Sequence, residues 1–271
     1  MTAGDYTRAD AALAARGLAP SREKARALIE AGLATVNGAV IAKPAQKIGP
    51  EDALAVTGET CPYVSRGGFK LKKALDTFGG KVSGAVCLDV GASTGGFTDV
   101  LLREGAARVY AVDVGTNQLD PRLRGDSRVV CMEKVNARTL NRDMFPEPPS
   151  VAVMDVSFIS IRLILPALFG LLGPTGRLIS LVKPQFEAGR ASVGKGGIVS
   201  SLQAHRRVLT EIAAFPEALG WRVRAMTVSP ITGGDGNVEF LADMLPAGAC
   251  ERAVTLDEID ALARAAKPAK G

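Results

Sequence analysis

The pattern of apolar and polar residues divides the chain near residue 60. Before that point the apolar residues lie in short amphipathic stretches broken by glycine, and Asn37-Gly38 separates two runs that contain β-branched residues. Glycine is common at helix ends, and Asn-Gly between such runs is typical of a two-residue hairpin turn. We expect helices over Arg8–Arg16 and Ser21–Ala31, a hairpin centred on Asn37-Gly38, and a strand over Ala53–Val56. The N-terminal part is therefore predicted to be a small α+β unit.

Beyond residue 66 the pattern changes to apolar runs that alternate with longer helical segments. We expect strands over Val82–Val90, Arg108–Val112, Arg128–Met132, Val151–Met154, Gly176–Val182, Trp221–Val228 and Val238–Asp243. We expect helices over Ser65–Phe78, Thr98–Arg103, Ile161–Leu172, Leu202–Leu219 and Leu256–Ala265. Strands that alternate with helices build a mostly parallel sheet with helices on both faces. The predicted fold class is α/β with a Rossmann-like sheet, in which the last strand is an antiparallel edge strand.

A glycine-rich turn, Asp-Val-Gly-Ala-Ser-Thr-Gly-Gly-Phe, follows the first strand of this sheet. Glycine lets the backbone turn tightly and approach a ligand closely. Asp113 ends the second strand about twenty residues later, where an acid typically binds the ribose hydroxyls of a nucleoside. We expect a nucleoside site formed by Asp89, Gly91, Ser93, Gly95, Gly96, Phe97, Asp113 and Asn136.

The pattern of this turn favours S-adenosylmethionine over a dinucleotide. A pyrophosphate needs the bare backbone amides of G-x-G-x-x-G, and here Ser93 replaces the middle glycine. S-adenosylmethionine carries no phosphate, so a looser D-x-G-x-x-x-G-G loop with carboxylates nearby can serve its sulfonium, amino acid and ribose. A glycine-rich turn without any ligand is the simpler alternative, and the strand–loop–helix–strand order around the turn favours a site.

Charged residues lie at the ends of several predicted strands. Asp155 and Lys183 follow the fourth and fifth strands, and Glu239 lies at the start of the last one. Ligands of such sheets bind at the carboxyl ends of the parallel strands, and an antiparallel strand begins at that same edge. Lys70, from the helix before the first strand, can reach the same place. The sequence therefore predicts two lysines and two carboxylates in one cleft, although each residue taken alone would more often form a surface ion pair.

Composition limits the other kinds of site. One histidine, His205, and four separated cysteines supply no metal-binding cluster and no Ser-His-Asp triad, so we expect no metal. The most apolar region, 151–172, is not expected to span a membrane, because Asp155, Arg162 and Pro166 interrupt it. The start of the chain lacks the apolar core of a signal peptide, and we expect a cytoplasmic protein. The net charge of +5 permits a polyanionic partner without requiring one.

The N-terminal unit carries basic residues on its second predicted helix. Arg22 and Arg26 are four residues apart and share one helix face, and Lys43 and Lys47 can meet phosphates beside it. Residues 1–60 hold seven basic and seven acidic side chains, so net charge does not distinguish an RNA-binding face from a solvated helix. The element order, with Ser21-Arg22, Lys24, Arg26, Gly32, Val36-Asn37-Gly38 and Lys43-Pro44, resembles the S4 RNA-binding domain.

Segments across nearly the whole chain resemble a single family. They are Ser65-Arg-Gly-Gly-Phe-Lys70, Asp89-Val-Gly-Ala-Ser-Thr-Gly-Gly-Phe97, Met154-Asp-Val-Ser-Phe-Ile159, Val182-Lys-Pro-Gln-Phe-Glu187, Gly194-Lys-Gly-Gly197 and Asn237-Val-Glu-Phe240. Together with the S4-like start they are similar to the TlyA family, which joins an S4 domain to an FtsJ-like methyltransferase domain. Members of that family are taken to be 2′-O-methyltransferases that act on cytidines of 16S and 23S ribosomal RNA, and some carry a haemolysin name.

This resemblance implies roles for particular residues. The K-D-K-E tetrad of the family maps onto Lys70, Asp155, Lys183 and Glu239, and the methyl donor is S-adenosylmethionine. We expect RNA contacts from Arg22, Lys24, Arg26, Lys43, Arg66 and Lys195. The expected domains are an S4-like RNA-binding domain over 1–60, a linker over 61–66, a methyltransferase domain over 67–248, and a C-terminal helix and tail over 249–271.

The sequence leaves open the role of Lys183 and two alternative functions. Lys183 is expected to lie nearest the ribose hydroxyl, either as a general base or as an ammonium group that stabilises the developing alkoxide. A non-catalytic S4-type RNA-binding or ribosome assembly protein would bind RNA without needing the tetrad. A pore-forming haemolysin would need amphipathic or membrane-spanning segments, and we find none in the sequence.

Overall fold

The chain divides into two units, residues 1–62 and 63–271. The computed structural model describes residues 6–30, 32–56 and 61–266. The predicted linker over 61–66 lies within the described residues, whereas residues 57–60 before it, the tail from residue 267, and Ala31 at the predicted end of the second helix lie outside them. Within the described residues, no helix is long and apolar enough to cross a membrane.

The first unit is a small α+β structure. Its elements are β1 (Thr7–Arg8), α1 (Ala9–Ala15), α2 (Arg22–Glu30), β2 (Ala34–Val36), β3 (Ala39–Val40), β4 (Lys47–Ile48) and β5 (Leu54–Val56). Strands β3, β2 and β5 form one antiparallel sheet, and β1 pairs with β4 in a second. The predicted hairpin joins β2 to β3, and its turn places Asn37 at φ 50° and Gly38 at φ 83°, as a two-residue turn with two positive φ angles requires. Leu13, Ile29, Ile41 and Ile48 are buried in its core.

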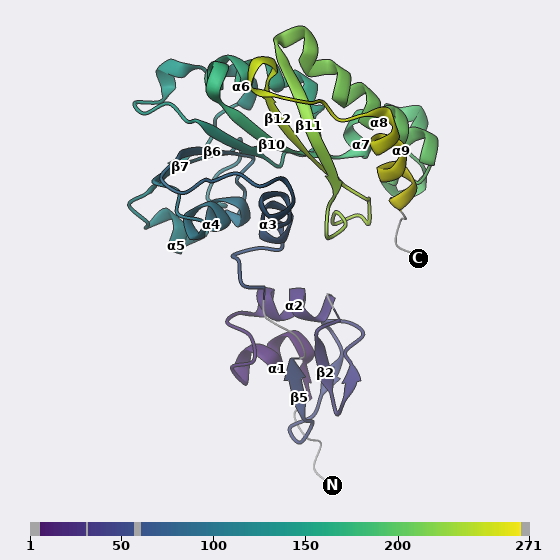
Figure 1. Cartoon of the computed structure of the whole chain (residues 1–271). Coiled ribbons are helices and arrows are strands. Elements are labelled where there is room, and N and C mark those ends of the chain that lie inside the picture. The colour runs from purple at the N-terminus through teal and green to yellow at the C-terminus, as the bar shows by residue number, and fades with distance from the viewer. Residues whose placement is uncertain (1–5, 31, 57–60, 267–271) are drawn as a thin grey trace. The chain divides into compact units, whose positions relative to one another are not determined.

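The second unit follows the predicted alternation of strands and helices (Figure 1). Its strands are β6 (Val86–Val90), β7 (Arg108–Val112), β8 (Val129–Met132), β9 (Val151–Met154), β10 (Arg177–Val182), β11 (Trp221–Val228) and β12 (Phe240–Pro246). Its α-helices are α3 (Gly67–Phe78), α4 (Gly96–Arg103), α5 (Pro121–Arg124), α6 (Leu165–Leu172), α7 (Pro184–Glu187), α8 (Leu202–Ala214) and α9 (Leu256–Ala265). Short 3₁₀ turns fill several of the connections.

The seven strands form one sheet in the order β11-β12-β10-β9-β6-β7-β8. Strands β10, β9, β6, β7 and β8 are parallel to one another, whereas β12 runs antiparallel to both β10 and β11. The predicted direction of β12 is confirmed, and its predicted place at the edge is wrong, because β12 lies between β10 and β11. Nearly every residue of β12 is buried, as expected of an inner strand, while the edge strand β11 exposes Arg222.

Successive side chains of the strands point to opposite faces of the sheet, and they form one apolar core on each face. Cys87, Val109 and Val153 point to the face covered by α3, α4 and α5. Leu88 and Tyr110 point to the opposite face, which α6 and α8 cover (Figure 1). This alternation follows from the two-residue period of a strand, and it leaves the carboxyl edge of the sheet open for ligands.

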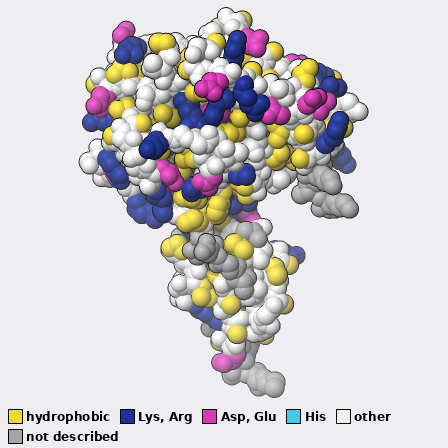
Figure 2. Space-filling view, in the orientation of Figure 1, with side chains coloured by type: hydrophobic (Ala, Val, Ile, Leu, Met, Phe, Trp, Pro, Cys, Tyr) yellow, Lys and Arg dark blue, Asp and Glu magenta, His cyan; other side chains and the backbone are white. Residues whose placement is uncertain are grey.

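The surface of the second unit mixes basic and acidic side chains. On the face seen in Figure 2, Lys and Arg side chains are interspersed with Asp and Glu side chains rather than gathered in one field. Charged side chains of the second unit also form ion pairs, such as Arg122 with Asp120 and Arg128 with Asp126. This face therefore shows no single field of positive charge.

A buried ion-pair cluster joins the far end of α3 to the sheet. Asp243 on β12 is fully buried, and its two carboxylate oxygens accept hydrogen bonds from Arg177 Nε at 2.7 Å and Arg224 Nε at 2.6 Å. Arg224 also donates to the carbonyl oxygen of Phe78, the last residue of α3, at 2.6 Å. Because α3 also carries Lys70, the cluster fixes one end of the helix whose other end faces the site.

Replacing Asp243 with asparagine is expected to lower the free energy of unfolding by about 3 kcal/mol, since it leaves two partly buried guanidinium groups without their counter-charge. Urea denaturation measures this loss. The control is Asp76→Asn, which removes an exposed carboxylate paired with Lys72 and is expected to leave the stability nearly unchanged. Equal stability of the Asp243→Asn and wild-type proteins would show that the cluster does not hold this end of the unit together.

Candidate active site

The glycine-rich turn brings the ends of β6 and β9 together. Gly91 directly follows β6 with φ at +81°, and a Cβ atom there would lie 2.5 Å from the carbonyl oxygen of Asp155. Only glycine allows this approach without displacing the backbone of the neighbouring segment. Ser93 is also at positive φ, 47°, and its N–H donates to the Asp113 carboxylate at 2.8 Å. The turn thereby places the ends of three parallel strands around one opening.

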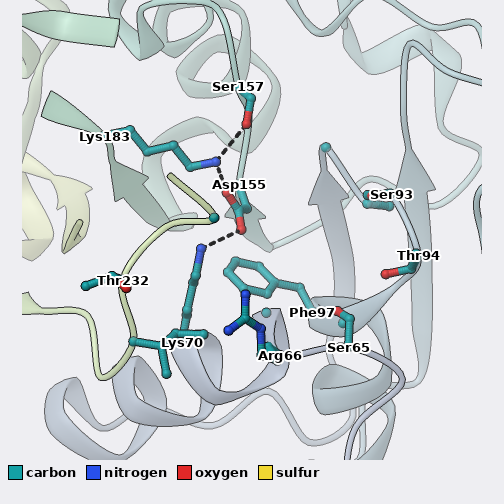
Figure 3. A pocket seen from close by; sticks show the side chains of 16 residues that line it. Ser65, Arg66, Lys70, Ser93, Thr94, Phe97, Asp155, Ser157, Lys183 and Thr232 are labelled. Carbon is teal, nitrogen blue, oxygen red and sulfur yellow. Dashed lines mark hydrogen bonds and ion pairs between the residues drawn. The ribbon is translucent and has the colours of Figure 1, made fainter. Parts of the chain in front are cut away.

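The four predicted tetrad residues lie in one continuous chain of ion pairs. Lys70 Nζ lies 2.6 Å from Glu239 Oε2 and 3.5 Å from Asp155 Oδ2. Lys183 Nζ lies 2.6 Å from Asp155 Oδ1, so Asp155 stands between the two lysines (Figure 3). Positive and negative groups alternate along this chain. Asp155 comes from the end of β9, Lys183 from the end of β10 and Glu239 from the residue before β12.

The tetrad is shielded from bulk water. The exposed fractions of the side chains are 10% for Lys70 and Lys183, 19% for Asp155 and 3% for Glu239. Charges removed from water interact strongly, and the loss of one partner leaves the other costly to keep charged. Four such groups at the carboxyl edge of a sheet are therefore costly to the fold, which is typical of a functional site.

Two cavities open beside the tetrad. The first, which we call the tetrad cavity, has a volume of about 340 Å³ and is lined by Lys70, Asp155 and Lys183 together with residues of the glycine-rich turn. The second, which we call the nucleoside cavity, has a volume of about 530 Å³. Gly91, Ser93, Asp155 and Ser157 line both cavities, so they share a wall.

The predicted nucleoside-site residues divide between these two cavities. Asp113 and Asn136 line the nucleoside cavity, and Gly96 and Phe97 line the tetrad cavity. Glu239 lines neither, because it lies behind Lys70 with its Oε1 atom only 2.8 Å from the place where a Cβ on Gly233 would be. Glu239 is therefore connected to this site through its ion pair with Lys70.

Asp89 departs from the expectation that it faces a ligand. Its side chain is fully buried beneath the turn and lines neither cavity, and its Oδ2 atom accepts a hydrogen bond from the Thr98 hydroxyl at 2.7 Å. Burial raises the pKa of Asp89 to about 7, and the neighbouring carboxylates of Asp155 and Asp113 add to the rise. The physical reason is its register, since Asp89 shares the strand face of Cys87, which points toward α4. Asp89 thus holds the start of α4 in place.

Gly95 also lies outside both cavities. Its φ is +94°, and a Cβ atom there would lie 2.3 Å from a methyl carbon of Leu123 and 2.8 Å from one of Leu119. The residue is therefore required for the packing of the turn against α5 and the loop before it. Gly95 was predicted to line the donor site, and in this structure it lines neither cavity and packs against Leu119 and Leu123 instead, a contact that sequence spacing alone does not reveal.

Several site residues were not identified from the sequence. Ser157 accepts a hydrogen bond from Lys183 Nζ at 2.9 Å, and Thr232 lines the tetrad cavity (Figure 3). Gln118 and the apolar residues Val112 and Val135 line the nucleoside cavity. The position of Ser157, two residues after a strand-end aspartate, is a signal that points to it. Thr232 lies in an irregular loop and carries no such signal.

Contacts that we call the strap join residues 158–161, which follow β9, to α7, which follows β10. The Glu187 carboxylate is buried and accepts hydrogen bonds from the Ser160 hydroxyl at 2.6 Å and from the Ile161 backbone N–H at 2.8 Å. The rings of Phe158 and Phe186 lie 5.3 Å apart between their centroids. Asp155 and Lys183 directly follow the paired strands β9 and β10, so the strand pairing brings them together and the Glu187 contacts connect the segments beyond them.

The nucleoside cavity fits the donor that the sequence suggests. Each Asp113 carboxylate oxygen accepts one backbone hydrogen bond, from Ser93 N–H at 2.8 Å and from Gly115 N–H at 2.7 Å. A carboxylate oxygen can accept two, so both retain capacity for ribose hydroxyls. Apolar walls from Val112 and Val135 suit a purine ring. The residues are therefore compatible with S-adenosylmethionine.

Replacing Asp113 with alanine is expected to weaken the binding of S-adenosylmethionine by about 10- to 100-fold, the loss that follows when hydrogen bonds to a charged acceptor disappear. Isothermal titration calorimetry measures the dissociation constant. Asp126→Ala, which removes a surface carboxylate paired with Arg128, serves as the control and should bind normally. Unchanged affinity in a folded Asp113→Ala protein would remove Asp113 from the donor site.

The predicted RNA-contacting residues are exposed. Arg66 is exposed at the rim of the tetrad cavity, and Lys195 is exposed in a 3₁₀ turn. On α2, Arg22 pairs with Asp10 at 3.4 Å and Arg26 pairs with Glu30 at 2.8 Å. Lys24 and Lys43 are also exposed. The exposed pair of Arg26 with Glu30 contributes little stability, so a phosphate can replace that carboxylate at low cost, whereas Asp10 is buried and also pairs with Arg8.

The seven-stranded sheet with one reversed strand and two adjoining cavities at its carboxyl edge defines a Rossmann-like methyltransferase preceded by an S4-type unit. The FtsJ-like methyltransferase family matches residues 63–243, and the S4 domain family matches residues 7–54. The chain belongs to the TlyA family of FtsJ-like methyltransferases.

Relatives and a solved structure support this assignment. The 16S/23S rRNA (cytidine-2′-O)-methyltransferase TlyA of Mycobacterium tuberculosis is 45% identical over 86% of this chain and 87% of its own. Hemolysin A of Brachyspira hyodysenteriae is 45% identical over 88% of this chain and 99% of its own. A solved Streptococcus thermophilus structure that carries a hemolysin name superposes with a TM-score of 0.77 at 45% identity, covering 96% of this chain and 95% of that one.

Proposed function

We propose that this protein transfers the methyl group of S-adenosylmethionine to the 2′-hydroxyl of a cytidine in ribosomal RNA, 16S, 23S or both, in the cytoplasm. The observation that carries the proposal is the wall of Gly91, Ser93, Asp155 and Ser157 that the nucleoside cavity shares with the tetrad cavity. A donor in one cavity would present its methyl group to an acceptor in the other. The activity named for the 45% identical relative from Mycobacterium tuberculosis supports the same reaction.

The donor, when bound, supplies a methyl group on a positively charged sulfur. The residues of this chain supply the rest of the reaction. Asp113 is proposed to hold the ribose of the donor, and Asp155 carries negative charge at the wall between the cavities. The glycine-rich turn shapes the wall so that the two reactants meet in line. Orientation of this kind accounts for a large part of the rate of such transfers.

Lys183 is proposed to act on the acceptor hydroxyl. A ribose hydroxyl is a poor nucleophile at neutral pH, so it needs either a base that takes its proton or a positive charge that stabilises the developing alkoxide. Lys183 lines the tetrad cavity, and Asp155 lies 2.6 Å from its Nζ atom. Lys70, held between Glu239 and Asp155, keeps that carboxylate in position from the other side.

The S4-type unit is proposed to bind the ribosomal substrate. Its residues Arg22, Lys24, Arg26 and Lys43 are exposed, and none of them lines the nucleoside cavity. Arginine and lysine bind the phosphate backbone, and that binding releases counterions, so affinity should fall steeply with salt. Arg66 at the rim of the tetrad cavity is proposed to contact the RNA next to the target ribose.

Methyl transfer from labelled S-adenosylmethionine tests the proposal. Purified protein is incubated with isolated 30S and 50S subunits from cells that lack the modification, and the label in ribosomal RNA is counted. We expect label in the RNA of at least one subunit, and no label when Lys183→Ala replaces the wild-type protein. A non-catalytic S4-type RNA-binding or assembly protein, the second candidate, would bind a subunit and transfer no label, which would contradict the proposed function.

A further inference from the structure

Lys183 makes two contacts that differ in kind. Asp155 Oδ1 lies 2.6 Å from Nζ, yet this oxygen has no hydrogen-bond partner among the described residues, so the contact is an ion pair without hydrogen-bond alignment. Ser157 Oγ lies 2.9 Å from Nζ and accepts a directed hydrogen bond from it (Figure 3). Asp155 therefore attracts the Lys183 ammonium group by its charge, and Ser157 sets the orientation of that group through a hydrogen bond.

Direction matters because the lysine nitrogen is tetrahedral. The Cε–Nζ bond takes one of its four positions, and rotation about that bond turns the other three together. A point-charge attraction changes little during this rotation, whereas a hydrogen bond weakens steeply once its angle is lost. A single acceptor in a fixed place therefore sets the rotation of the whole group, whether the remaining positions carry protons or a lone pair.

We propose that Ser157 is a positioning residue for Lys183, whose hydroxyl oxygen fixes the rotation of Nζ so that a free position of the nitrogen faces the tetrad cavity. This inference rests on the proposed methyl transfer to a ribose hydroxyl. Ser157 lines both the tetrad cavity and the nucleoside cavity, so its hydroxyl lies beside the path between donor and acceptor.

The pairing of β9 with β10 brings Ser157 beside Lys183, since Met154 lies next to Ser180 in the parallel register, and Ser157 itself is exposed. The Glu187 carboxylate accepts hydrogen bonds from Ser160 and Ile161 further along the same loop, and the ring of the exposed Phe158 lies 5.3 Å from that of Phe186 between centroids. Phe186 and Glu187 follow Lys183 within the turn after β10. The loop that carries Ser157 and the segment that carries Lys183 are therefore joined at the paired strands and again at Glu187, which keeps the two residues next to each other.

The test uses three single variants of the full-length protein. Ser157→Ala removes the hydroxyl, Ser157→Thr restores it, and Ser83→Ala removes an exposed hydroxyl from the loop before β6 as the matched control. The single-turnover rate of methyl transfer to ribosomal subunits is measured with saturating enzyme and donor. The dissociation constants for S-adenosylmethionine and for the subunit are measured separately.

We expect Ser157→Ala to lower the single-turnover rate by about 10- to 100-fold, the range for a misdirected reacting group. Both dissociation constants should change by less than about 3-fold, because a positioning role acts on the reaction rather than on binding. Ser157→Thr should recover most of the rate. Ser83→Ala should match the wild type in every measurement.

Two results would overturn the inference while leaving the proposed function intact. One is a Ser157→Ala rate within about 2-fold of an active wild-type protein. The other is a rate loss that Ser157→Thr does not repair and that is matched by weaker binding of the donor, which would show a structural role in the nucleoside cavity. A wild-type protein that transfers no methyl group to either subunit would instead contradict the proposed function, and the inference with it.

Discussion

Replacing Lys183 with alanine is expected to lower the single-turnover rate of methyl transfer by at least about 1,000-fold. Proton transfer by a positioned side chain contributes about 10²–10⁴-fold, and a preorganised charge beside a developing oxyanion contributes a similar factor. Lys183 lines the cavity next to the donor wall, and 90% of its side-chain surface is shielded from water. Affinities for S-adenosylmethionine and the subunit should stay within about 3-fold, because this role belongs to the transition state.

Two further variants sharpen this prediction. Lys183→Arg keeps the charge but cannot release a proton in a protein, so an active variant would favour electrostatic stabilisation, and an inactive one would favour a general base or a misfit of the larger group. Lys72→Ala removes a lysine that pairs with Asp76 on the surface of α3, and it should leave the rate unchanged. A Lys183→Ala protein with a near-normal single-turnover rate would contradict the assignment of the tetrad.

A protein that begins at Cys61, and so lacks the S4-type unit, is expected to methylate ribosomal subunits at least about 100-fold more slowly at low substrate concentration. Losing several phosphate contacts lowers the affinity for RNA by orders of magnitude at physiological salt. Binding of S-adenosylmethionine should stay within about 2-fold, because every residue that lines the nucleoside cavity lies beyond residue 89. The Val64 backbone N–H, which donates to Asp99 at 2.9 Å, is retained in this protein.

Full-length variants provide the matched comparison for the shortened protein. Arg22→Ala combined with Arg26→Ala removes two basic groups from α2, and it should weaken subunit binding and reduce its salt dependence. Glu23→Gln changes the charge of an exposed residue on the same helix by one unit in the opposite sense, and it should not weaken binding. Equal activity of the shortened and full-length proteins on subunits would refute the proposal that the S4-type unit binds the ribosomal substrate.

The sequence carried most of the information needed for the fold. Apolar runs located the strands because a central parallel strand is buried on both faces, and Asn37-Gly38 located the hairpin because both residues tolerate positive φ. The neighbours of β12 were harder to predict, since chain order does not say which strand pairs with β10. The contrast between the apolar run of β12 and the arginines Arg222 and Arg224 of β11 is the signal that distinguishes the inner strand from the edge.

The sequence predicted those residues of the candidate site that lie at the ends of strands. Asp155 and Lys183 meet because parallel strands end at one edge, and Glu239 joins them because β12 runs backward. Side-chain direction was not predictable without the register of the strand. Asp89 points beneath the turn toward Thr98, although its place in the sequence is that of a ligand contact.

Contacts between loops were also beyond the reach of the sequence. Gly95 is required by the methyl groups of Leu119 and Leu123, which approach it from a segment more than twenty residues away. Ser157 meets Lys183 across a sequence separation of 26 residues, because β9 and β10 pair in parallel with Met154 beside Ser180 and the contact continues that register beyond the strand ends. Such contacts depend on the packed positions of both partners, and neither segment encodes them alone.

The identity of the methylated nucleoside tests the central claim most directly. Subunits from cells that lack the modification are treated with the purified protein and labelled S-adenosylmethionine, and the ribosomal RNA is digested to nucleosides and separated by mass spectrometry. The proposed function predicts that the label appears as 2′-O-methylcytidine with the wild-type protein and is absent with Lys183→Ala. Label found on a base, or no label in ribosomal RNA at all, would contradict the account.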